Sequence, residues 1–205
     1  MPRAVAILLF PEVEELDFCG PWEVFSYLRK VRPDACTVYT LSEHGGEVRC
    51  AKGLRVLADH PLDSAPPADV LVVPGGWGTR REVDNPRLID FIRRTAERAE
   101  VVASVCTGAF LLERAGLLAG RRATTHWASL DRLRALGTVR VVEDRWVDEG
   151  RVVTAGGISA GIDMSLHLVG RLWGPPTARR VQKGIAYFPD PPYGDVPIPD
   201  EPFAP

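Results

Sequence analysis

The chain has 205 residues, 45% of them hydrophobic and 25% charged, a balance that supports one domain with a substantial core and argues against wholesale disorder. Its 25 basic and 27 acidic side chains give a formal net charge of −2, which excludes the concentrated basic surface that nucleic acids require. No apolar stretch approaches the roughly 18 residues that span a bilayer, and no signal peptide opens the chain. We therefore expect a cytoplasmic protein with no nucleic-acid or membrane partner.

The four cysteines are spaced unlike those of metal sites. Cys19, Cys36, Cys50 and Cys106 form no C-x-x-C pair and no Cys/His zinc pattern. We expect free thiols in a reducing compartment, with no metal bound.

Buried strands and amphipathic helices alternate along the first half of the chain. The continuous apolar run 4–10 predicts a strand buried on both faces; further strands are predicted at 36–41, 69–74 and 101–105, and the stretch 43–59 predicts a hairpin. Gly20-Pro21 is expected to open one helix, with the proline in its first turn, and Asn85-Pro86 to cap another.

The second half continues the alternation. Helices are predicted at 108–118 and 128–136, strands near 139–142, 145–147 and 152–154, and an amphipathic helix through 162–173. A further helix is expected at 177–187, and a Pro-rich tail without its own core follows. We place the domain at 1–193 and the tail at 194–205. Such alternation favours an α/β fold with a mostly parallel sheet covered on both faces.

Three predicted strands end in residues suited to chemistry. These ends are Phe10-Pro11, the turn that starts at Pro74, and the turn that starts at Cys106. In parallel sheets, sites form outside the carboxyl ends of the strands, so we expect the three segments to meet in a functional site.

Cys106 is the candidate nucleophile because it stands between an apolar strand and a helix. A tight turn there projects the side chain outward, as in a nucleophile elbow. The N–H groups at the helix start favour the reactive thiolate, so we expect an ionised sulfur. A small buried apolar residue is the plain alternative for a cysteine at such a turn.

Three other segments strengthen the functional interpretation. Glycines from Gly75 to Gly78, around Trp77, allow backbone N–H groups such as that of Gly76 to bind developing negative charge. Asp17 lies between apolar neighbours and is a candidate general acid or base. His126 is a candidate pocket residue, although an interior histidine bonded to backbone is an equally good interpretation.

The segments FPEVEELDFCGPWEVF, VVPGGWG, SVCTGAFLLERAGLLAGRRATTHW and TAGGISAGIDMSLHLV together resemble the DJ-1/PfpI superfamily, most closely its isocyanide (isonitrile) hydratase branch. The resemblance implies a flavodoxin-like, three-layer α/β/α sandwich of the class I glutamine amidotransferase type. It also implies a homodimer that acts on a small molecule without metal or organic cofactor.

The resemblance assigns roles to individual residues. Cys106 matches the nucleophile and Asp17 the catalytic acid/base. Thr107 follows the nucleophile where protease-like members have histidine, which argues against peptidase activity. The segment that contains Ile158 matches one that packs against the nucleophile.

The expected activity is hydration of an organic isocyanide to an N-substituted formamide through a covalent thioimidate. One alternative is a glyoxalase-type reaction on small reactive carbonyls by the same thiol. A non-enzymatic alternative is a redox or ligand sensor that works through Cys106.

Overall fold

The apolar runs of the sequence form the centre of a seven-stranded sheet. The structure, a computed structural model, describes residues 2–194. The strand order is β10–β11–β7–β6–β1–β2–β5, and only the β10–β11 pair is antiparallel within this sheet. The strands are β1 (Arg3–Leu8), β2 (Cys36–Ser42), β5 (His60–Pro61), β6 (Val70–Val73), β7 (Val101–Val105), β10 (Trp146–Asp148) and β11 (Val152–Ala155).

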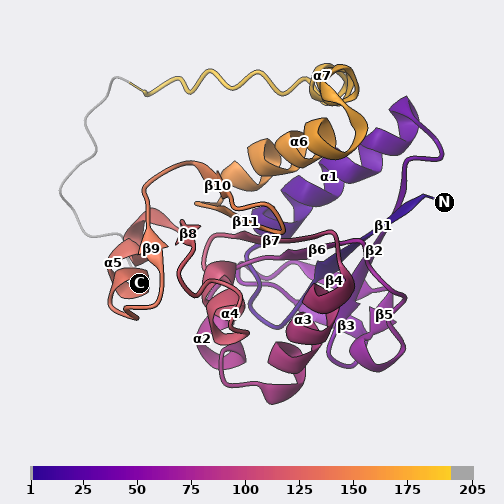
Figure 1. Cartoon of the computed structure of the whole chain (residues 1–205). Coiled ribbons are helices and arrows are strands. Elements are labelled where there is room, and N and C mark those ends of the chain that lie inside the picture. Colours follow the sequence, from indigo (N-terminus) through magenta and orange to yellow (C-terminus); the bar gives the residue numbers. More distant parts are fainter. Residues whose placement is uncertain (1, 195–205) are drawn as a thin grey trace.

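Helices cover both faces of this sheet (Figure 1). On one face, α1 (Glu15–Val31), α6 (Ala160–Trp173) and α7 (Pro175–Gly184) pack against one another. The opposite face carries α2 (Thr79–Glu82), α3 (Pro86–Arg98) and α4 (Gly108–Arg114). The predicted flavodoxin-like α/β/α sandwich is confirmed. Its core consists of the central strands, whose residues in β6 and β7 are all buried.

Smaller elements sit around the sandwich. The predicted hairpin is present as the antiparallel strands β3 (Gly46–Arg49) and β4 (Arg55–Ala58). A short parallel pair, β8 (Arg122–Ala123) and β9 (Arg140–Val141), lies near α5 at one end of the molecule (Figure 1). The remaining elements are η1 (Leu62–Ser64), η2 (Trp127–Ser129) and α5 (Leu130–Arg134).

The predicted start of the first helix was wrong. Helix α1 begins at Glu15, and Pro21 lies inside it rather than in its first turn. A proline within a helix removes one backbone hydrogen bond. Burial of the Phe18 ring, which the extra turn brings into the interior, offsets that loss.

Two other helix boundaries differ from the predictions. Helix α4 ends at Arg114 instead of extending to residue 118, because the chain turns at Gly116, whose φ is 80°. Helix α7 begins at Pro175, since proline is well suited to the first helical position. The predicted cap is present: the Asn85 side chain accepts hydrogen bonds from the backbone N–H groups of Arg87 and Leu88.

The topology brings the three predicted segments together. Strands β1, β6 and β7 are neighbours and run parallel, so their carboxyl ends lie at one edge of the sheet. The loop after β1 also pairs with the loop after β6 through an antiparallel bridge between Val13 and Gly76.

The predicted tail, 194–205, lies almost entirely outside the described residues. Within residues 2–194, no helix is both long and apolar enough to cross a membrane. No cluster of three or more potential metal ligands occurs in that part of the chain.

Packing between α1 and α6 can be tested at Phe25. Its fully buried ring meets the Trp173 ring edge-on at 6.4 Å between centroids. Phe25→Ala should lower the free energy of unfolding by about 3–5 kcal/mol, because the cavity does not refill. Urea denaturation measures the change. Phe188→Ala, at a ring that is 52% exposed, is the matched control and should change stability by less than about 1 kcal/mol; equal losses would contradict this packing.

Candidate active site

Cys106 occupies the turn between β7 and α4 in a conformation that is uncommon for a residue with a side chain. Its φ is 56°, a strained value that costs about 1–3 kcal/mol and persists only where surrounding contacts offset this cost. Hydrogen bonds from remote segments hold both peptide groups of this residue: its N–H donates to the Ala155 carbonyl at 2.9 Å, and its carbonyl accepts from the Thr125 side-chain hydroxyl at 2.8 Å. The turn therefore places the sulfur at the carboxyl edge of the sheet.

The chain after β11 packs directly against the cysteine. A Cβ atom at Gly157 would lie 2.5 Å from the Cys106 Cβ atom, so only glycine permits this approach. Ile158 follows at once and reaches the cavity next to the sulfur.

Asp17 is the buried acid of the site. Its side chain has no exposed surface, and Oδ2 accepts a hydrogen bond of 3.0 Å from the Gly75 N–H. Oδ1 is buried with no hydrogen-bond partner among the described residues. A Cβ atom at Gly75 would lie 2.9 Å from Oδ2 and 2.5 Å from the Thr107 nitrogen, so the glycine allows α1, β6 and α4 to converge here. One carboxylate oxygen is thus held while the other is available.

Thr107 connects the cysteine turn to the glycine-rich loop. Its Oγ1 accepts from the Gly76 N–H at 3.0 Å and lies 3.1 Å from Thr79 Oγ1. The Gly76 N–H is therefore already paired within the protein. Its contribution is to hold Thr107, whose backbone N–H and side chain interact with the Cys106 sulfur.

Burial dominates the electrostatics of the acid and the thiol. It raises the pKa of Asp17 from 3.8 to about 8, against the lowering effect of the Gly75 N–H. Burial first, and then the neighbouring Asp17, raises the pKa of the Cys106 thiol well above its usual value, although the Thr107 groups lower it in part. The expectation of an ionised resting thiol was therefore wrong: the pKa of Cys106 is raised, not lowered. Desolvation raises this pKa by more than the N–H groups at the helix start lower it.

A cavity of about 470 Å³ opens in front of the sulfur. Its lining includes six of the residues that the sequence singled out, namely Gly76, Trp77, Cys106, Thr107, His126 and Ile158. Asp17 lies behind this lining, close enough to Cys106 for each to shift the pKa of the other. Burial lowers the pKa of His126, which favours a neutral imidazole at the wall.

Sequence reasoning missed several residues of the wall, namely Glu14, Arg80, Trp127, Ala128 and Ser129. An arginine in a charged segment such as Arg80-Arg81 is typical of a solvated helix face. The position of Arg80 three residues after Trp77, at the start of a helix, was the available signal, because that spacing brings side chains together on one helical face. The guanidinium in fact lies over the Trp77 ring at 3.9 Å from its centroid.

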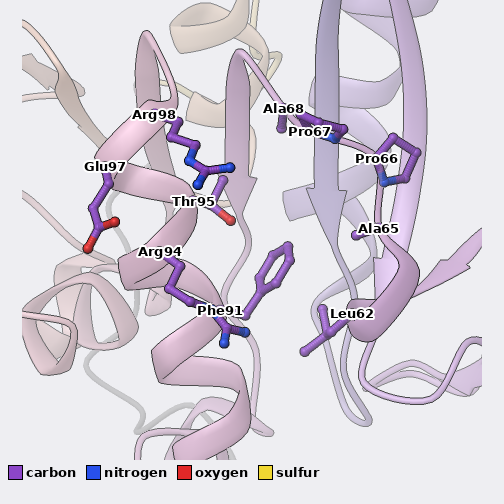
Figure 2. Close-up of a pocket in the computed structure, with 10 residues that line it drawn as sticks. All are labelled: Leu62, Ala65, Pro66, Pro67, Ala68, Phe91, Arg94, Thr95, Glu97 and Arg98. Carbon is purple, nitrogen blue, oxygen red and sulfur yellow. The ribbon is translucent and has the colours of Figure 1, made fainter.

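Another hollow, of about 300 Å³, lies between α3 and the segment 62–68 (Figure 2). Phe91 and Leu62 face each other across it. Its lining contains no cysteine, histidine or aspartate in the described structure. The cavity at Cys106 is therefore the better candidate for chemistry.

The fold and this site define a class of α/β sandwich proteins with a cysteine at a strand-to-helix turn and a buried acid beside it. Residues 3–171 match the DJ-1/PfpI family, and the chain belongs to that family.

Individual relatives agree with this placement. The chain is 41% identical to isonitrile hydratase from Pseudomonas putida, over 94% of this chain and 82% of the relative. It is 26% identical to the glutathione-independent glyoxalase DJR-1.2 of Caenorhabditis elegans, over 89% and 96% of the respective chains. The crystal structure of a ThiJ/PfpI family protein from Pseudomonas syringae has a TM-score of 0.88 at 29% identity, covering 96% of this chain and 80% of the other.

The buried carboxyl of Asp17 should make stability depend on pH. The folded protein keeps this proton up to a pKa of about 8, whereas the unfolded chain releases it near 3.8. The stability that Asp17 contributes is therefore fully present below about pH 4 and is lost as the pH rises toward 8, by up to about 1.4 kcal/mol per unit. Asp17→Asn should remove this slope in chemical denaturation; parallel curves for the two proteins would show that Asp17 is not buried in this way.

Proposed function

We propose that the protein hydrates organic isocyanides to N-substituted formamides through a covalent intermediate on Cys106. The observation that carries the proposal is a thiol at the wall of a cavity with a buried carboxyl directly behind it, close enough for each group to shift the pKa of the other. The 41% identity to an isonitrile hydratase over 94% of the chain supports the choice of substrate. In this proposal the turn at Cys106 acts as a nucleophile elbow, and no metal or organic cofactor takes part.

The reactive form of the pair holds one proton. Burial and mutual repulsion oppose placing a negative charge on both Asp17 and Cys106, so loss of one proton leaves a single anion shared between them. Transfer of the remaining proton from sulfur to carboxyl yields thiolate and neutral acid. The N–H and side chain of Thr107 stabilise that thiolate.

In the first step, the thiolate attacks the terminal carbon of the isocyanide, R–N≡C. A carbon–sulfur bond forms, and the carbon takes the proton of Asp17, which gives the thioimidate R–N=CH–S–Cys106 and an aspartate. Oδ1, which is buried without a partner, is the oxygen suited to this transfer because Oδ2 is held by Gly75.

In the second step, water adds to the thioimidate carbon. Asp17 accepts a proton from the water and passes it to the nitrogen, which gives R–NH–CH(OH)–S–Cys106. The hydroxyl proton then returns to Asp17 as the carbon–sulfur bond breaks. The products are the formamide R–NH–CHO and the starting pair of thiolate and acid. Trp77, His126 and Ile158, which line the cavity, surround the group R.

Two alternatives use the same sulfur. The likeness to a glyoxalase favours testing small dicarbonyls as substrates. A redox sensor is less well supported, because the raised pKa of the Cys106 thiol disfavours the thiolate that oxidises readily. The homodimer and the cytoplasmic location remain predictions.

The role of Cys106 can be tested by substitution. Cys106→Ala should abolish formamide formation from p-nitrophenyl isocyanide, because Cys106 is the one thiol in the described lining of the cavity. Chromatographic product analysis measures the rate. Cys19→Ala is the matched control, since Cys19 is partly buried and is not part of the cavity wall, and it should retain activity. Formamide production at the wild-type rate by Cys106→Ala would exclude the scheme. Lactate from methylglyoxal, with no formamide from the isocyanide, would instead favour the glyoxalase reaction.

The shared proton should appear in the pH profile. The value of kcat/KM should rise with pH and level off near the Asp17 pKa of about 8, because the doubly protonated pair is inactive. Asp17→Asn should reduce kcat/KM at least about 100-fold and lose this inflection, since it has neither the acid nor the coupled proton. A profile that is flat from about pH 6 to about pH 9 in the wild type would contradict the proposed pair.

A further inference from the structure

A positively charged group that the mechanism does not use stands at the cavity that contains Cys106. Arg80, on α2, lines this cavity and lies over the Trp77 ring at 3.9 Å from its centroid. Arg132, on α5, lies over the Phe110 ring at 4.5 Å. Neither guanidinium has a carboxylate partner within residues 2–194.

Arg81, the next residue in the chain, does have carboxylate partners. Arg81 donates to Glu82 at 3.0 Å and to Glu12 at 3.2 Å. For Arg80, burial and then the positive charge of Arg132 lower the pKa of the guanidinium, and only Cys106 raises it. Two like charges near each other without a counterion leave a local excess of positive potential at the cavity wall.

The one acid in the described lining of the cavity is not paired with Arg80. Glu14 lines the same cavity, but its carboxylate is paired with Lys52. The Arg80 guanidinium also senses the Cys106 sulfur electrostatically, so the two groups face the same space. An anion bound at Arg80 would therefore lie across the cavity from the nucleophile.

We propose that Arg80, supported by Arg132, binds a carboxylate on the substrate while the isocyanide carbon of the same molecule faces Cys106. Because Trp77 covers one face of the guanidinium, its N–H edge remains to form the paired hydrogen bonds that match a carboxylate. The substrate class is then small isocyano-carboxylic acids, with the group R between the two ends. This inference rests on the proposed function for the reaction, but the anion site can be tested separately.

The separate test uses alkylating agents instead of isocyanides. Iodoacetate and iodoacetamide differ mainly in the negative charge, and both alkylate a thiol. Peptide mass spectrometry gives the two rates at Cys106. The ratio of the iodoacetate rate to the iodoacetamide rate should fall roughly tenfold or more in Arg80→Gln, since a hydrogen-bonded ion pair is lost. Arg132→Gln should lower it about two- to threefold, because Arg132 acts at longer range.

The matched control is Arg93→Gln, which removes the same charge from an exposed i,i+3 pair with Asp90 on α3. It should leave the ratio unchanged within about twofold. A wild-type experiment keeps the proposal testable if Arg80→Gln does not fold. Butyrate should protect Cys106 from iodoacetamide at concentrations at which the neutral butyramide does not. An Arg80→Gln ratio equal to that of the wild type, or equal protection by butyrate and butyramide, would overturn the anion site.

Turnover of isocyanides with and without a carboxylate then tests whether the anion site contributes to the proposed reaction. For the wild type, kcat/KM for 4-isocyanobenzoate should exceed that for its methyl ester about tenfold, and Arg80→Gln should lose this preference. Failure to turn over either compound, with the alkylation ratios as expected, would overturn the hydratase function and leave the anion site. Turnover of the ester at least as fast as the acid, with unchanged alkylation ratios, would overturn the anion site and leave the hydratase.

Discussion

The site depends on the burial of one carboxyl group beside one thiol. Asp17 is fully buried, its Oδ2 accepts a hydrogen bond from the Gly75 N–H, and its carboxyl interacts with the Cys106 thiol. This desolvation raises the pKa of the acid to about 8, and together with the acid it raises that of Cys106. A pair that resists double ionisation keeps a proton next to the sulfur at neutral pH. Hydration of an isocyanide needs this combination, because the carbon must receive a proton as the sulfur attacks it.

The fold produces this proximity through the order of its strands. Helix α1 follows β1, the glycine-rich loop follows β6, and Cys106 follows β7, and these three strands are adjacent. The segment after β11 is the fourth part of the site, because Gly157 packs directly against Cys106. Contacts between segments distant in sequence hold the strained φ of Cys106, so the position of its sulfur depends on the whole sheet. Sheet packing and site geometry therefore depend on the same backbone.

Much of this arrangement was predictable from the sequence, and the reasons for the exceptions are physical. Continuous apolar runs identified the central strands, and the position of Asp17 between two apolar residues marked it as an inward-facing acid. The charge state of Cys106 was not predictable from the sequence. The residues next to it in the chain indicate a helix start, which stabilises a thiolate, whereas the burial that opposes the thiolate comes from remote segments such as that of Gly157. Because proline is common in the first turn of a helix, Pro21 indicated a helix start there, although α1 in fact begins at Glu15. That Arg80 has no carboxylate partner among residues 2–194 appears only when the loops are placed in space.

The central claim is that Asp17 remains protonated in the folded protein at neutral pH. Infrared difference spectroscopy between the wild type and Asp17→Asn, from about pH 5 to about pH 9, detects the protonated carboxyl directly. The account predicts a carboxylic-acid band that persists through neutral pH and disappears around the Asp17 pKa of about 8. A band already absent at about pH 6 would show an ordinary, solvated aspartate and would contradict the account.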